Sequence, residues 1–368
     1  MISKELVVIE RYVPRNPVHE PNRDGFRADS LLVIDNADLG PIGVVRKKTH
    51  YVNSPADVMI MPLEGAISQI TELSEAEAAS FLLTCARVVD AMREISPDGS
   101  PVIAINQQPD CIMLPTKFAP DGTELKVQTI DAIHAHVFLE DGRGLPRGTI
   151  SSMDKVASTD FFDPLGHAVS QLFISEVNRQ LDEAGLATQS TYNTDHFPLG
   201  INVPFDGDIV AVLTDPRIAR FIQATQRSYV QTYRMIEQIW QNYSGEARRD
   251  QITQFFSGLS GENIQVREFV ERVILSLRED VSGVERHHRL VQGPALTWVI
   301  YERDGRCYIH LTPRFFSRGN AMEDLGVWVE PVEEVTPDLS EANDFYRLLM
   351  VKLGSTLLVS EGASLYEN

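Results

Sequence analysis

Hydrophobic and polar positions along the first hundred residues alternate in a way that predicts two strands, a helix and a third strand. Residues 30–45 contain two apolar runs, with Asn-Ala-Asp and Gly-Pro-Ile-Gly supplying the turn chemistry. Residues 72–95 carry apolar side chains at helical spacing, and Ser74 and Glu77 form a capping box near their start. Residues 100–106 then predict a short strand that ends in asparagine.

A fourth strand is predicted over residues 130–138, an apolar run without Gly or Pro. Side chains point to opposite faces in turn along a strand, so His134 and His136 share one face with Ala132 and Phe138. Strand geometry places the two histidines about 7 Å apart along the chain. Both imidazoles therefore point the same way from one strand.

The second half of the sequence is richer in predicted helix. Residues 162–185 predict one helix, with Pro164 near its start and Gly185 at its end. Residues 214–240 predict a longer helix that is capped by Asp215 and has proline in its first turn. Both segments carry the apolar stripe expected of helices that pack on one side.

Two strands near the C-terminal end complete a weak internal repeat. A helical stretch near 265–280 is followed by residues 295–316, which predict two strands joined by a turn at Asp-Gly, and the second strand carries His310. Each half of the chain thus offers a helix, a strand, and then a strand with histidine. A repeat of this length predicts a duplicated domain, with a boundary in the Gly-, Pro- and Ser-containing stretch near 145–160.

Composition narrows the class of protein. The chain is 43% hydrophobic, enough for a substantial core, and its formal net charge of −19 disfavours non-specific binding to nucleic acid or acidic membranes. No apolar run reaches the length of a signal-peptide core or a membrane span, so we expect a cytoplasmic protein. Cys85, Cys111 and Cys307 lie far apart, which favours reduced structural thiols over a disulfide framework or a zinc–thiolate site.

Paired histidines on a strand have four competing uses: metal ligation, nucleophilic catalysis with a helper, acid–base catalysis, and packing. A metal site needs further ligands, and Asp131 is predicted to point to the opposite face. His50, His310, His167 or His196 could supply such a ligand through the fold. The residues alone leave these four uses open.

The surrounding sequence resembles that of a known family. The string QTIDAIHAHVFL resembles the signature of the histidine-triad superfamily, in which Gln and a small hydroxyl residue precede His-φ-His-φ-His-φ-φ, φ being apolar. Upstream, IDNADLGPIGVVRKKTHYV and IAIN resemble the segments that precede this signature in the family, in the same order. Downstream, YIHLTPRFFSRGNAMEDLGVWVE resembles the closing segment of the galactose-1-phosphate uridylyltransferase branch, whose members have two such domains in tandem.

This resemblance implies an α+β fold with two histidine-triad-like domains in tandem, each an antiparallel sheet packed with helices. Residues 1–150 would form the domain with the paired histidines, and residues 151–368 a second, degenerate domain with helical insertions. The implied activity is nucleotidyl transfer from a nucleotide or nucleotide sugar to a phosphorylated acceptor or phosphate. A homodimer is an assembly that tandem domains of this kind often form.

The resemblance also implies roles for individual residues. His134 would be the nucleophile that attacks the α-phosphorus and holds the nucleoside monophosphate, and His136 would donate to a phosphate oxygen or the leaving group. Four residues would bind the nucleotide by their positions in the motifs: Asp35, Asn106, Gln128 and Thr129. Four more would line the pocket: His50, His310, Arg314 and Arg318.

Four departures from the family pattern keep other activities open. Ala132 stands where the first histidine is expected, and the cysteine pair of the uridylyltransferase zinc site is absent, so we expect no structural zinc there. His136 matches the hydrolases and not the Gln of the transferases, and residues 107–126 are an insertion that we expect to shape the acceptor or leaving-group pocket. Hydrolysis or phosphorolysis of a nucleotide or dinucleotide, acid–base catalysis without a nucleotide adduct, and a pure binding role all remain alternatives. No cofactor is implied with certainty, and the need for a divalent metal is open.

Overall fold

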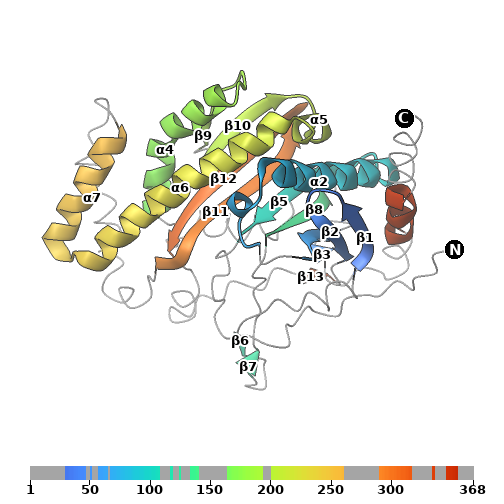
Figure 1. Cartoon of the computed structure of the whole chain (residues 1–368), viewed down its shortest axis with the longest axis horizontal. Coiled ribbons are helices and arrows are strands. Elements are labelled where there is room, and N and C mark those ends of the chain that lie inside the picture. The colour runs from blue at the N-terminus through green and yellow to red at the C-terminus, as the bar shows by residue number, and fades with distance from the viewer. Residues whose placement is uncertain are drawn as a thin grey trace.

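A computed structural model gives the positions of twelve stretches of the chain, which carry a nine-stranded antiparallel sheet and the helices packed on it (Figure 1). This arrangement confirms the predicted α+β class. The described residues are 30–46, 50–51, 57–64, 67–107, 117–118, 124–125, 133–140, 164–193, 200–260, 290–316, 334–335 and 345–354.

The large sheet has the strand order β1-β2-β4-β8-β5-β11-β12-β10-β9, and each neighbouring pair is antiparallel. Its strands are β1 (Ser30–Asn36), β2 (Gly40–Arg46), β4 (Asp57–Pro62), β5 (Ser100–Asn106), β8 (His134–Glu140), β9 (Thr191–Asn193), β10 (Gly200–Asp206), β11 (Leu290–Arg303) and β12 (Arg306–Phe316). Two further antiparallel pairs are short: β3 (His50–Tyr51) with β13 (Glu334–Val335), and β6 (Lys117–Phe118) with β7 (Glu124–Leu125).

The described helices are η1 (Ile70–Glu72), α2 (Glu75–Ile95), α4 (Pro164–Glu183), α5 (Ile209–Leu213), α6 (Pro216–Asn242), α7 (Gly245–Ser260) and a helix over 345–354. Helices α2, α4 and α6 form where the sequence pattern predicts them. Ser74 and Glu77 form the predicted capping box of α2, and the side chain of Asp215 accepts from the backbone of Arg217 at the start of α6. The helix expected near 265–280 lies outside the described residues, and the sequence pattern does not predict α5, α7 or the helix over 345–354.

The first hairpin corrects one detail of the sequence interpretation. Asn36 closes the turn by accepting from the backbone N–H groups of Asp38 and Leu39, at 3.0 and 3.1 Å. Gly-Pro-Ile-Gly, which the sequence pattern assigns to the turn, instead begins β2. Pro41 is tolerated because it lies at the beginning of the strand, where its missing N–H removes little from the ladder.

The two faces of the sheet differ in what they pack against. One face joins the helices in a single large core, to which α6 contributes the predicted stripe. The opposite face carries two small apolar clusters built, among the described residues, from strands and the segment just after β4. The stripe residues of α6 that are buried in the core are Ile218, Phe221, Ile222, Tyr229 and Ile236.

The described halves of the chain share one order of elements. Apart from the short elements η1, β6 and β7, the first runs β4, α2, β5, β8; the second runs β10, then the helices α5, α6 and α7, then β11 and β12. The halves meet where β5 pairs with β11, so that one sheet runs through both (Figure 1). This order extends the internal repeat predicted from the sequence. The boundary near 145–160 lies outside the described residues, and the division at residue 150 stays a prediction.

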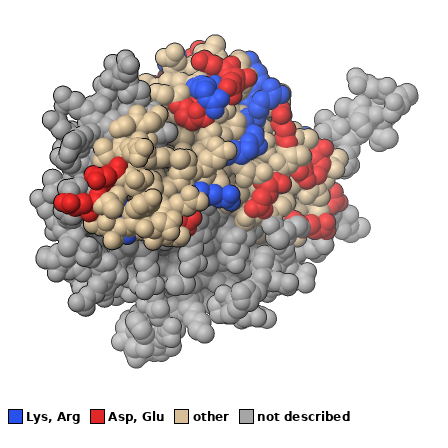
Figure 2. Space-filling model, turned by 60° about the vertical axis from the view of Figure 1, so that its left-hand side comes forward, with Lys and Arg blue, Asp and Glu red and all other residues tan. Residues whose placement is uncertain are grey.

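The surface of the described part is mixed in charge. Lys and Arg side chains lie between acidic ones on the face shown in Figure 2. Exposed salt bridges such as that of Arg220 on α6 with Glu75 on α2, at 2.8 Å, belong to this pattern. Such pairs stabilise a fold by at most about 1 kcal/mol each. Among the described helices, none combines the length and the apolar character of a membrane span.

Candidate active site

The two predicted catalytic histidines lie at the start of β8, in the interior of the large sheet. His134 is the first residue of the strand, and each of the two histidines is 8% exposed. Phe138 packs in the cluster on the same face, whereas Ala135 and Val137 belong to the core on the helical face. The predicted alternation along this strand is therefore confirmed from His134 onward.

The two imidazole rings are in contact with each other. Their centroids are 5.1 Å apart, and the ring planes meet at 81°. Alternation along one strand is the cause, because it brings residues two apart onto the same face. Two imidazoles in this arrangement can address neighbouring atoms of one small ligand. Each imidazole can act as nucleophile, proton donor or proton acceptor, depending on which ring nitrogen carries hydrogen.

The strand beside His134 ends in a network of buried amides. Asn106, the last residue of β5, pairs with His134 across the ladder. Gln107 follows it and is 1% exposed. Its side-chain oxygen accepts from the N–H of Ile70 at 2.9 Å, and its Nε2 donates to Oε1 of Gln226 and to the carbonyl of Leu296, each at 3.1 Å. Gln107 thus joins η1, α6 and β11 at the end of β5.

Gln223, which lies on α6 like Gln226, also holds η1. Nε2 of Gln223 donates to the carbonyls of Ile70 and Leu73, at 2.9 and 2.7 Å. The residues before η1 in turn hold the chain just before β8, because the N–H of Ile133 donates to the carbonyl of Ile67 at 3.0 Å. Helix α6 therefore fixes the backbone directly before His134, although the two lie far apart in sequence.

The strand ladders place a third histidine on the same face as the first two. His136 pairs with Ala104 on β5, Ala104 with Val299 on β11, and Val299 with His310 on β12. Directly paired residues share a face, so His136 and His310 lie in one row across the sheet. Three strand spacings separate them, or about 14 Å between backbones.

His310 is oriented by a residue that the sequence interpretation missed. Its Nδ1 lies 2.6 Å from Oδ1 of Asn202, the directly opposite residue on β10, and the imidazole is completely buried. Asn202 also bonds the side chain of Tyr301, which stacks on Tyr308 with centroids 5.3 Å apart. Burial, followed by the proximity of Tyr308, raises the pKa of Tyr301 to about 12. The only sequence signal for Asn202 is its polar character within an apolar run.

Gly200 leaves room beside the other edge of the His310 ring. A Cβ at position 200 would lie 2.9 Å from Cε1 and 3.0 Å from Nε2 of His310, and 2.6 Å from the carbonyl oxygen of Leu311. The residue also has a φ of +151°, which side-chain-bearing residues rarely adopt. Glycine is therefore required here both by the backbone conformation and by the imidazole.

The remaining predicted site residues are distributed over the structure. Asp35 is exposed on the edge strand β1, three strands from β8. His50 belongs to the short pair β3–β13, and Arg314 to β12, where it pairs with Ala295. The structure thus joins His134, His136, Asn106, His310 and Arg314 in one sheet, with Asp35 at its edge. Gln128, Thr129, Arg318, Ala132 and most of the insertion over 107–126 lie outside the described residues.

The described part of the chain contains neither a cluster of metal ligands nor an exposed cysteine. Within the described ranges, no group of three or more His, Cys, Asp or Glu side chains is arranged to hold a metal ion. Cys85 and Cys307 are free thiols and are buried. Burial raises the pKa of both thiols above the ordinary value, which removes the thiolate needed for nucleophilic chemistry.

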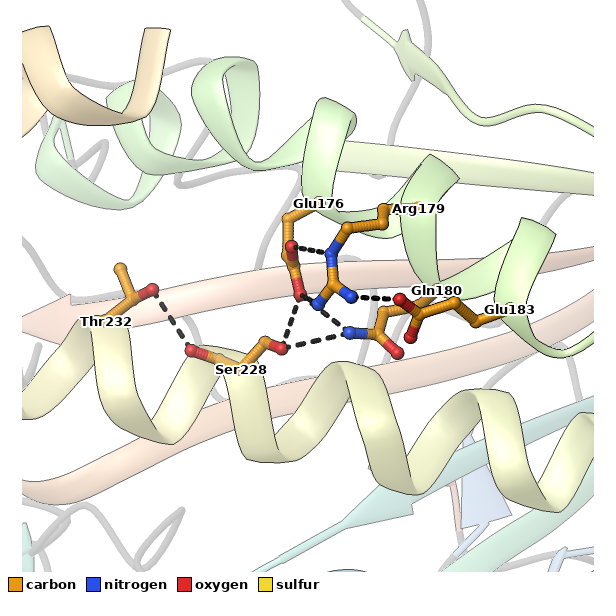
Figure 3. A network of polar contacts seen from close by, with 6 residues as sticks. All are labelled: Glu176, Arg179, Gln180, Glu183, Ser228 and Thr232. Atoms are coloured by element: carbon orange, nitrogen blue, oxygen red, sulfur yellow. Dashed lines mark hydrogen bonds and ion pairs between the residues drawn. The ribbon is translucent and has the colours of Figure 1, made fainter.

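A cluster of charged and polar side chains lies between α4 and α6 (Figure 3). Glu176 accepts from Ser228 at 2.5 Å, from Gln180 at 2.7 Å and from Arg179 at 2.6 and 2.8 Å. Burial raises the pKa of Glu176, but the hydrogen bonds from Arg179, Ser228 and Gln180 outweigh it and leave the pKa below its usual value. Glu183 continues the cluster by bonding Arg179. The contacts hold α4 and α6 together, so the cluster is structural.

A second charged group joins the halves of the sheet. Arg93 in the last turn of α2 bonds Glu302 on β11 and lies 3.4 Å from Asp208, the N-cap of α5. Glu302 also accepts from the N–H of Ile209 at 2.6 Å. The carboxylate thus satisfies a free N–H at the start of a helix while it pairs with a cation, which stabilises this junction.

Comparisons of the chain with protein-family models, with curated proteins and with solved structures found no match.

Proposed function

We propose that the protein is a nucleotidyltransferase of the histidine-triad type, in which His134 carries a nucleoside monophosphate between a donor and a phosphorylated acceptor or phosphate. The observation that carries this proposal is the pair of buried imidazoles on one strand, with ring centroids 5.1 Å apart. The resemblance of the surrounding motifs to the histidine-triad superfamily gives the reaction class. The repeated order of elements in the two halves agrees with the tandem arrangement of the uridylyltransferase branch.

The reaction would proceed in two displacements. A ring nitrogen of His134 attacks the α-phosphorus of the donor, a P–N bond forms, and the P–O bond to the leaving group breaks with its electron pair going to the departing oxygen. A phosphate oxygen of the acceptor then attacks the same phosphorus. The P–N bond breaks, its electron pair returns to the ring nitrogen, and His134 is regenerated.

The neighbouring groups suit this chemistry. His136 contacts the ring of His134 and can donate a hydrogen bond to a non-bridging phosphate oxygen or to the leaving oxygen, where negative charge develops. The network of Gln107 and Gln223 holds the segment that bonds the backbone directly before His134, so the nucleophile does not have to be ordered during the reaction. Preorganisation of this kind lowers the barrier of the chemical step.

Intact-protein mass spectrometry tests the proposal. The protein is incubated briefly with a panel of nucleoside triphosphates and nucleotide sugars at mildly alkaline pH, where a phosphoramidate survives. We expect a mass gain of one nucleoside monophosphate in the wild type and in Thr225→Val, a matched control that removes a buried hydroxyl from α6. His134→Ala should show no gain. A folded wild type that gains no mass with any donor refutes the proposal.

One observation favours a second candidate, hydrolysis or phosphorolysis of a nucleotide or dinucleotide. His136 stands at the third motif position, as in the histidine-triad hydrolases, and not the glutamine of the transferases. Water or orthophosphate would then resolve the same adduct on His134. The two candidates differ in the second step. Release of the nucleotide in the absence of any sugar phosphate would assign the protein to the hydrolases or phosphorylases.

A further inference from the structure

The outer face of helix α6 carries a straight line of basic and polar side chains. The helix lies on the helical side of the sheet beside α4 (Figure 1), and its apolar stripe faces the core. On the opposite side, Arg220, Arg227 and Arg234 follow one another at intervals of seven residues, and all three are exposed. Gln231 and Gln238 are also exposed on this side and are also seven residues apart. These five residues form the arginine line.

Helix geometry makes the arginine line straight. Seven residues are nearly two turns, so each arginine lies about 10.5 Å along the axis from the one before and is rotated by only about 20° around it. Exposed positions that repeat every seven residues match those of a second helix lying nearly parallel to the first. Met235, which is 53% exposed, lies beside the line one turn after Gln231. It adds a flexible apolar side chain of the kind that interfaces favour.

Two arginines of the line have no partner within the described part of the chain. Arg220 bonds Glu75 of α2 at 2.8 Å, whereas among the described residues no ion pair or hydrogen bond holds the side chain of Arg227 or Arg234. Helix α6 carries four arginines, and Glu237 is its only acidic residue. The helix is therefore basic within a chain whose formal net charge is −19. Guanidinium groups at a fixed spacing favour a partner that has carboxylates at the same spacing.

Other occupants fit this face less well. A protein that binds nucleic acid commonly contacts about 6–10 phosphates, whereas the line offers three guanidinium groups on an acidic chain. Acidic membranes are disfavoured by the same net charge. A second copy docked about a two-fold axis would bring two faces of like charge together, because both copies present the same line. A helix with a few carboxylates carries far less charge than a nucleic acid and can pair with each arginine in turn.

We propose that the arginine line docks an acidic helix of a partner protein, one with Glu or Asp at every seventh position. Successive carboxylates of the partner pair with Arg227 and Arg234, and an apolar side chain of the same helix packs on Met235. Arg220 keeps its bond to Glu75 and marks the end of the docking face. Pairs between exposed charges are weak and are screened by salt, so the complex is reversible and salt-sensitive. The inference does not depend on the proposed catalytic activity.

Two synthetic helical peptides of identical composition test the docking. One carries Glu at every seventh position with a leucine beside each, and the other has the same residues in an order without a repeat. Binding of each labelled peptide to the full-length protein is followed by fluorescence anisotropy at low and at high salt. The variants are Arg227→Gln, Arg234→Gln and the double change. The matched control is the double change Arg303→Gln and Arg306→Gln, which removes the same charge from exposed positions at the β11–β12 turn.

We expect the repeat peptide to bind the wild type more tightly than the scrambled peptide does, with an affinity that falls as salt rises. Each single change should weaken binding by about 2- to 5-fold and the double change by about 10-fold, the effect of losing one or two exposed ion pairs. The control variant should bind as the wild type does. Changing Arg227 and Arg234 to Glu should instead favour a peptide with lysine in place of each glutamate. Thermal melting establishes that each variant is folded.

Four results would overturn the inference. Absence of binding between the wild type and the repeat peptide would show that the arginine line docks no acidic helix. Equal binding of both peptides would show that the seven-residue spacing has no role. Equal weakening in the control variant would show that the attraction comes from overall charge. Self-association of the wild type, or tighter binding of a single-stranded oligonucleotide or of phosphatidylglycerol vesicles, would assign the face to another occupant if it is lost in the double Gln variant.

Discussion

Replacing Gln107 with leucine tests how much the buried amide network beside β8 contributes to the free energy of unfolding. Leucine has a similar volume but no polar atoms, so the change removes three hydrogen bonds: from the N–H of Ile70, to Oε1 of Gln226 and to the carbonyl of Leu296. All three partner groups lie in the interior around Gln107, which is 1% exposed. A typical buried hydrogen bond contributes about 1 kcal/mol, and an unpaired buried partner costs about 1–3 kcal/mol.

Three such bonds put the expected loss in the free energy of unfolding of Gln107→Leu at about 3 kcal/mol. Urea unfolding followed by far-UV circular dichroism measures it, as a lower midpoint at an unchanged slope. Thr225→Val on α6 is the control, since the hydroxyl of Thr225 is buried without a hydrogen-bond partner in the described structure and its removal should cost nothing or stabilise. A loss below about 1 kcal/mol for Gln107→Leu would refute the reasoning, because the three bonds would then contribute less than one ordinary bond.

A double-mutant cycle locates the effect in the network. Gln107 and Gln226 share one of the three bonds, so the changes Gln107→Leu and Gln226→Leu should not be additive. We expect a coupling of about 1 kcal/mol, with the double variant less destabilised than the sum of the single changes. Additive effects would mean that the two glutamines contribute independently and that the bond between them has no energetic role.

Three further predictions concern titration and thiol reactivity. The lowered pKa of Glu176 means that its carboxylate stabilises the fold above the ordinary value of 4.5, so the stability difference between wild type and Glu176→Gln should shrink as the pH falls below 4.5 in acid unfolding curves. Burial raises the pKa of Tyr301 from 10.0 to about 12, so the folded state keeps this proton to higher pH than the unfolded chain, and stability should fall between pH 10 and 12. Burial also raises the pKa of Tyr192, so Tyr301→Phe should reduce this dependence, and the matching phenolate absorbance, without abolishing it. In a Cys111→Ser variant, neither Cys85 nor Cys307 should react with a thiol reagent before the protein unfolds, and rapid labelling of the native protein would contradict their burial.

Local elements were largely predictable from the sequence. The capping box of Ser74 and Glu77 and the proline-containing start of α6 depend on residues a few positions apart, and both occur where expected. The hairpin of β11 and β12 is equally predictable because the turn at Asp304-Gly305 places both residues at positive φ. Alternation along β8 likewise predicts that His134 and His136 share one face, since it depends only on the spacing of two nearby residues.

Other elements escaped prediction because their signals are weak or non-local. Strand β10 begins with Gly200 and contains Pro204 and the polar Asn202, three residues that are depleted in strands. It is stabilised by its neighbour β12, whose sequence lies about a hundred residues further on. Helix α7 was missed for a related reason, since its apolar positions form only a weak stripe.

The sequence by itself determined the main helices with their caps and the shared face of His134 and His136, since each depends on spacing within a short segment. Outside the two hairpins, β1–β2 and β11–β12, tertiary structure alone decided which strands pair. The pairing of β5 with β11 joins the two halves in one sheet and brings His136 and His310 into one row, while β10 supplies Asn202 to orient the second imidazole. The physical reason is that periodicity specifies which face a side chain takes, but a strand's partner is chosen by burial and hydrogen bonding summed over the whole core.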